Sequence, residues 1–129
     1  MKLRHVFAAN AVICFVYGGA FAAVPAFLLS LYGPTPNALG LLVGRLFGAL
    51  LLGLGLLCVK LMPLERTEAA RAVGLSLALA DALGCVFFAQ AALAGDVNAL
   101  GWSVVAIYGL LAAGLGVTAT GKPAAAPSP

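Results

Sequence analysis

Two charged side chains stand alone inside long apolar stretches, and they are the strongest candidates for a functional site. Arg45 lies within residues 38–60 and Asp81 within residues 72–94. A charge at the centre of a membrane-spanning helix costs about 2.5–3.5 kcal/mol on insertion scales, so each should face the protein interior and find a partner. Arginine and aspartate can pair through two parallel hydrogen bonds. We therefore expect Arg45 and Asp81 to lie close together.

Further polar residues reach a similar depth. Asn10, Cys14, Tyr17 and Phe21 follow the spacing of one helix face, and Tyr108 lies about as far along the last apolar stretch. The spacing predicts an intramembrane polar cluster, whose members are Arg45, Asp81, Tyr17, Tyr108, Asn10 and Gln90. Two interpretations remain open: an ion pair that fixes helix pairing, or a binding site for a ligand or ion.

Common catalytic and cofactor arrangements are missing from the pattern. His5 is the single histidine, so no serine has a histidine base nearby and paired histidines cannot hold a haem. Cys14, Cys58 and Cys85 fall at different depths of three apolar stretches, which argues against a disulfide. We expect no enzymatic activity, no catalytic residue, no metal site and no cofactor.

The elements that must position these residues are membrane-spanning helices. The chain of 129 residues is 64% hydrophobic and only 9% charged, and about 20 apolar residues suffice to cross a bilayer core of about 30 Å. The pattern predicts an all-α integral membrane four-helix bundle in one domain, residues 1–121, with a disordered Pro/Ala-rich tail, residues 122–129. The predicted spans are residues 6–31, 38–60, 72–94 and 101–121. Pro25 should bend the first of them.

Lysine and arginine placement predicts the orientation. These residues gather at the amino terminus, near residues 60–71 and at residue 122, whereas the connections 32–37 and 95–100 contain none. By the positive-inside rule, both termini are cytoplasmic and the protein lies in a bacterial inner membrane. The net charge of +3 thus reflects topology, and we expect no nucleic-acid partner.

The amino-terminal segment has features of a signal peptide. A basic start precedes an apolar run, and residues 20–22 could serve as a cleavage site. The run is about 25 residues long, beyond the ~7 to 15 of a usual signal core. We therefore expect it to remain as the first span.

The chain contains an internal repeat. Residues 37–56 align with residues 98–117 without a gap, and ten of the twenty positions are identical. This predicts two related helical hairpins arranged as a parallel repeat.

Small residues recur at spacings that allow helices to approach closely. Gly40, Gly44 and Gly48 form one stripe, and Gly84 belongs to a similar pattern. We expect these glycines to serve helix packing, either as seams within the bundle or as a homo-oligomer interface.

The chain also resembles uncharacterised small four-span bacterial membrane proteins, similar in size and layout to DoxX-like proteins. The resemblance rests on residues 31–33, 44–49, 52–55, Asp81, Gln90 and 98–102. Some DoxX-like proteins are described as membrane subunits of quinone-linked oxidoreductases, but no motif here carries that activity over.

The short loops leave helix faces as the only large surfaces. We therefore predict a non-enzymatic accessory or scaffold subunit of a larger membrane complex, surrounded by the lipid bilayer and partnered by a membrane protein or by further copies of itself. The alternative is a small transporter or binder of an anionic or quinone-like ligand, using the site of Arg45 and Asp81.

Overall fold

The computed structural model describes residues 2–33 and 35–121, and this part of the chain contains helices and no strands. The α-helices are α1 (Leu3–Ala23), α2 (Pro25–Tyr32), α3 (Ala38–Leu61), α4 (Glu68–Ala94) and α5 (Gly101–Thr120), and a short 3-10 helix, η1 (Met62–Leu64), follows α3. Four helical segments are long and apolar enough to cross a membrane: α1, α3 with η1, α4 and α5. The all-helical class and four helices suited by length and composition to cross a membrane are confirmed, while the predicted tail lies outside the described residues.

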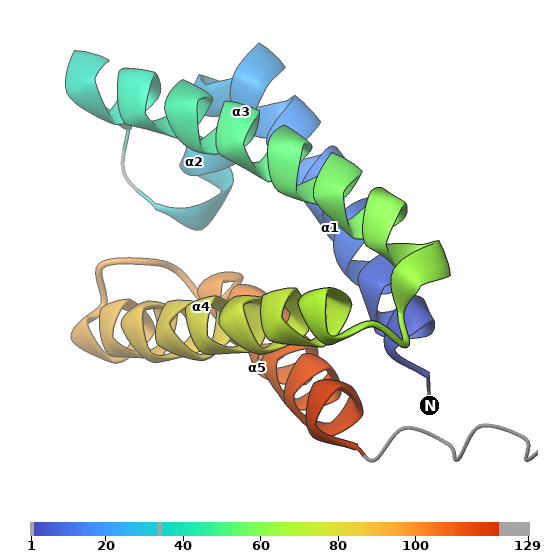
Figure 1. Ribbon diagram of the computed structural model, residues 1–129. Helices are drawn as coiled ribbons and strands as arrows, with labels where there is room; N and C mark the ends of the chain where they lie inside the picture. Colours follow the sequence, from blue (N-terminus) through green and yellow to red (C-terminus); the bar gives the residue numbers. More distant parts are fainter. Residues whose placement is uncertain (1, 34, 122–129) are drawn as a thin grey trace, which may run out of the picture.

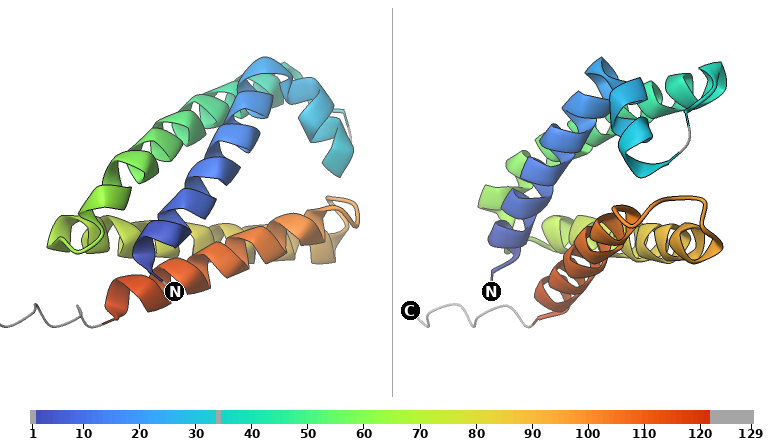
Figure 2. Two further views of the ribbon diagram at one scale, coloured as in Figure 1. Left: turned by 90° about the vertical axis from the view of Figure 1, so that its right-hand side faces the viewer. Right: turned by 180° about the vertical axis from the view of Figure 1, so that it is seen from behind.

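The helices form two hairpins that converge at one end and separate towards the other (Figure 1). α1 packs along α3 and α4 packs along α5, whereas the contact between the hairpins runs mainly through α1 and α5. Figure 2 shows the start of α1, η1 and the end of α5 at the convergent end, with α2 and the α4–α5 connection at the opposite end. The hairpins therefore pack against each other mainly at the convergent end and lie further apart at the other end.

The convergent end holds the hydrophobic core. Its buried side chains come from α1, α3, α4 and α5 and are Leu3, Val6, Phe7, Ala11, Cys58, Leu61, Ala70, Leu77, Leu115 and Ala119. Arg71 Nε donates a hydrogen bond of 2.8 Å to the Ala119 carbonyl near the end of α5. A cation is favourable there because the last carbonyls of a helix have no helical donor.

The first predicted span, residues 6–31, consists of two helices instead of one bent helix. Pro25 has no amide hydrogen, so the Phe21 carbonyl loses its usual donor. Val24 leaves the helical conformation at φ −134° and ψ 53°, although its amide still donates to Ala20 at 2.8 Å. Pro25 then becomes the first residue of α2, a position that suits proline. The chain consequently turns at Val24, and α2 crosses the open end.

Asn98 ties the two hairpins together at this open end. Its backbone amide donates to the Tyr32 carbonyl at 2.7 Å, and its Nδ2 donates to the Leu31 carbonyl at 2.6 Å. Both carbonyls belong to the last turn of α2, where helical donors are missing. The α4–α5 connection thus supplies hydrogen-bond donors to the last carbonyl groups of α2.

Glycines lie where helices of each hairpin come closest. A Cβ atom on Gly48 would lie 2.6 Å from the Ala22 amide nitrogen and 2.8 Å from the Gly18 carbonyl oxygen, so α1 and α3 touch through their backbones. Gly44 faces Phe21 and Pro25, and Gly84 faces the ring of Tyr108. Gly40 differs, because its neighbours are Pro36 and Asn37 at the start of its own helix.

The two halves of the repeat begin their second helices differently. Asn37 caps α3 by accepting a hydrogen bond of 2.8 Å from the Gly40 amide. The matching Asn98 does not cap α5, which begins three residues later at Gly101. The Oδ1 atom of Asn98 accepts a hydrogen bond of 3.0 Å from the Leu100 amide just before α5, and its Nδ2 donates to α2 as described above, so the shared motif has two structural uses.

Substitution of Gly48 tests the seam between α1 and α3. We expect Gly48→Ala to lower the free energy of unfolding by about 1–3 kcal/mol, because the new methyl group overlaps backbone atoms of α1. Gly53→Ala is the matched control, since a Cβ there meets no atom within 4 Å. Unfolding in detergent, followed by circular dichroism, measures both. Equal stability of the two variants would contradict the close approach at Gly48.

Candidate functional site

A cavity of about 440 Å³ lies between the two hairpins in their separated half. All five α-helices contribute to its wall, together with the α4–α5 connection. Most of the lining is aliphatic or aromatic, including Ile13, Leu29, Leu50, Leu51, Leu54, Leu77, Val97, Val104, Ile107 and Leu111. The fold thus surrounds an apolar space of the size that holds small molecules.

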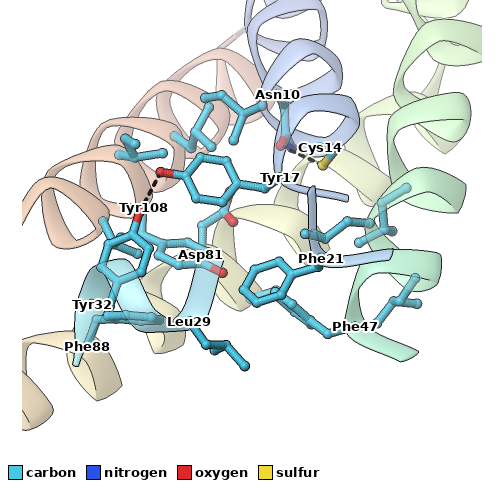
Figure 3. A pocket seen from close by; sticks show the side chains of 18 of the residues that line it. Asn10, Cys14, Tyr17, Phe21, Leu29, Tyr32, Phe47, Asp81, Phe88 and Tyr108 are labelled. Atoms are coloured by element: carbon cyan, nitrogen blue, oxygen red, sulfur yellow. Dashed lines mark hydrogen bonds between the residues drawn. The ribbon is translucent and has the colours of Figure 1, made fainter. Parts of the chain in front are cut away.

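Aromatic rings form much of the wall (Figure 3). The hydroxyl groups of Tyr17 and Tyr32 are hydrogen-bonded at 3.0 Å, which joins α1 to α2 across the bend. The Phe21 ring meets Phe47 edge to face, with 5.4 Å between ring centres, so α1 and α3 share a second contact. Tyr108 of α5 and Phe88 of α4 also line the space, with ring centres 6.1 Å apart.

Asp81 is the buried carboxyl group of this wall. Its side chain is 9% exposed, and its Oδ2 atom has no hydrogen-bond partner among the described residues. Figure 3 shows it among the rings of Tyr17, Phe21 and Tyr108. An unpartnered buried carboxyl oxygen is costly in any apolar surrounding. Such an atom is uncommon in folded proteins and requires an explanation.

Asn10 and Cys14 line the deeper part of the cavity, one helical turn apart on α1. Asn10 is 4% exposed, and its Oδ1 accepts a hydrogen bond of 3.4 Å from the Cys14 thiol. Tyr17 and Phe21 continue the same face. The helical spacing in the sequence thus identified four residues that line one cavity.

Arg45 does not take part in this site. It is exposed, whereas Gly44 and Gly48 of the same helix are buried against α1. Phe47 and Leu50 turn towards the cavity, and Arg45 is absent from its lining. Successive residues of a helix are rotated by about 100° around its axis. One face of α3 packs against α1 and another faces the cavity, so Arg45 lies on the outer side of the helix. The expected approach of Arg45 to Asp81 therefore does not occur.

The sequence placed Arg45 and Asp81 at a similar depth in the membrane. Depth does not specify in which direction a helix presents a side chain, so it could not show whether the two residues face each other.

Gln90 is also outside the site. Its side chain is exposed on α4 and does not line the cavity. Of the six residues predicted to cluster, the structure brings together four: Asn10, Tyr17, Asp81 and Tyr108.

Tyr32 is the lining residue that the sequence pattern missed. It follows the apolar run and precedes two prolines, a pattern that predicts the turn 32–37 instead of a helix. In the structure it ends α2, and the break at Val24 brings its hydroxyl to Tyr17. Pro25 was the signal available in the sequence, but a bend alone does not specify where the next helix points.

The described wall of the cavity is mostly apolar and contains few polar groups. Within the described residues no cluster of three histidine, cysteine or carboxylate side chains could hold a metal ion. The cavity contains one buried carboxyl group, with no histidine, lysine or arginine in its described wall. An apolar body with one polar group would match this wall.

Comparison with known proteins gives one family. No curated protein and no solved structure matches the chain. The model of a domain of unknown function, DUF8292, matches residues 1–120. This match covers nearly the whole chain, and the protein therefore belongs to the DUF8292 family.

Proposed function

We propose that this protein binds a lipophilic small molecule inside the membrane, in the cavity between its two hairpins. The observation that carries the proposal is the buried Asp81 carboxyl group, unpartnered at Oδ2, in the wall of an aromatic cavity. Apolar lining provides affinity for a lipophilic body, and a single polar group orients it. The cavity volume of about 440 Å³ falls within the usual range for small-molecule sites.

The arrangement of the helices supports entry from the lipid phase. α3 and α4 both line the cavity, but they belong to different hairpins and do not pack along each other. A molecule dissolved in the bilayer can therefore approach between them. This route suits a lipophilic ligand, because it need not cross the polar headgroups.

Filling the cavity tests this function. We expect Ala80→Trp to weaken binding of triphenylmethanol, a neutral lipophilic probe, by about tenfold or more, because Ala80 lines the cavity. Ala82→Trp is the matched control, since Ala82 is exposed on the same helix and does not line the cavity. Equilibrium dialysis against nanodiscs with and without the protein measures the difference. Binding that the two variants weaken equally would contradict a site at this cavity.

The proposed location is a bacterial inner membrane with both termini in the cytoplasm. The convergent end includes Arg4, Lys60, Arg66 and Arg71, and the only charged side chain in the connections of the opposite end is Asp96, among the described residues. Positively charged segments remain on the cytoplasmic side during insertion. The charge distribution of the folded hairpins therefore supports this orientation.

Single cysteines introduced at the two ends test the orientation. In a variant without the native cysteines, Thr35→Cys should react with an impermeant maleimide added to intact spheroplasts. Glu68→Cys should react only after lysis. Both positions are exposed. The reverse pattern would exclude the proposed orientation.

An accessory subunit of a membrane complex is the second candidate function. Arg45 supports it, because this exposed arginine is surrounded on the outer side of α3 by Leu42, Leu46 and Ala49, which are also exposed. An arginine facing lipid at this depth is costly, and a partner with a carboxylate at the same level would relieve that cost. The resemblance to DoxX-like proteins points to the same kind of function.

Native mass spectrometry after gentle extraction from the original membrane tests this second function. We expect another polypeptide to accompany the wild-type chain in a fixed ratio and to be lost in Arg45→Ala. Lys60→Ala removes an exposed positive charge at the end of the same helix and should retain the partner. A protein that is alone in all three preparations would argue against a subunit role.

A further inference from the structure

We propose that the ligand of the cavity is a lipophilic cation, whose positive charge lies beside Asp81. This inference rests on the proposed binding function and adds the chemical class of the ligand. Its basis is the combination of one unpartnered acidic group, a wall without basic side chains and a set of aromatic rings around that group.

The charges of the wall favour a cation. Among the described residues that line the cavity, the ionisable carboxyl groups are Asp81 and Asp96, and no lysine, arginine or histidine is present. An anionic ligand would meet two groups of its own sign. The anionic class expected from Arg45 in the sequence therefore does not suit this cavity, because Arg45 lies outside it.

Among the described residues, Asp81 has no positively charged partner. It is buried, and its Oδ2 accepts no hydrogen bond from any described residue. A buried carboxylate is stable only when an opposite charge or several donors compensate for the lost water. A cation supplied by the ligand would provide this compensation at the place where the protein does not.

The aromatic residues are suited to the same charge. Tyr17 and Phe21 of α1 and Tyr108 of α5 line the cavity with Asp81, as Figure 3 shows. The faces of aromatic rings carry partial negative charge and attract cations, most strongly where water is excluded. Aromatic rings also accommodate the apolar groups attached to a quaternary or phosphonium centre. A neutral lipid would gain the apolar contact with the rings but not the attraction between the ring faces and a positive charge.

Two probes of similar size distinguish the contribution of a positive charge to binding from the contribution of apolar surface. Methyltriphenylphosphonium is a lipophilic cation, and triphenylmethanol carries the same three phenyl groups without a charge. We expect the wild-type chain in nanodiscs to bind the cation about tenfold or more tightly than the alcohol, relative to empty nanodiscs. Asp81→Asn should remove this preference while alcohol binding changes by less than about threefold. Retained alcohol binding also shows that the variant is folded.

Glu68→Gln is the matched control, because Glu68 carries an exposed carboxyl group on the same helix as Asp81 and does not line the cavity. It should keep the preference for the cation. The inference is overturned if Asp81→Asn binds the cation as the wild type does, or if the wild type shows no preference while Ala80→Trp still weakens the alcohol. If neither probe binds saturably, the proposed binding function fails, and the inference fails with it.

Discussion

The missing amide hydrogen of Pro25 is the constraint on which the site depends. Without it the first apolar run cannot continue as one helix, and the chain turns at Val24. The turn sends α2 across the open end of the hairpins, where Tyr32 reaches Tyr17 and the last carbonyls of α2 reach Asn98. A straight first helix would leave these hydrogen bonds unmade, and the space between the hairpins would lose the part of its wall that α2 forms.

The two ends of the molecule differ in how closely the hairpins pack. Close backbone contacts at Gly18 and Gly48 hold one hairpin, and the core at the convergent end joins both hairpins. In hydrocarbon such contacts matter because lipid provides no hydrophobic force between helices. The separated half lacks comparable packing between hairpins, and Asp81 lies there with an oxygen left unpartnered. The proposed binding site therefore lies apart from the core that joins the hairpins.

The internal repeat shows how one motif can acquire two uses. Gly48 and the matching Gly109 both face the partner helix of their own hairpin, and a Cβ atom on Gly109 would lie 3.6 Å from the Cys85 sulfur. Asn37 and Asn98 have diverged in role, because one caps a helix and the other links hairpins. The repeated glycines thus allow a close backbone contact in the first hairpin and a looser contact in the second, and the different hydrogen bonds of the asparagines add to this asymmetry.

The sequence by itself determined the helical class, the four apolar segments and the shared face of Asn10, Tyr17 and Phe21. These properties depend on composition and on spacing along one helix, and both can be counted from the printed residues. Only the tertiary structure decided that Asp81 faces the cavity and Arg45 the outside. The rotation of a helix is set by the residues that it packs against, and depth along the membrane contains no information about that rotation.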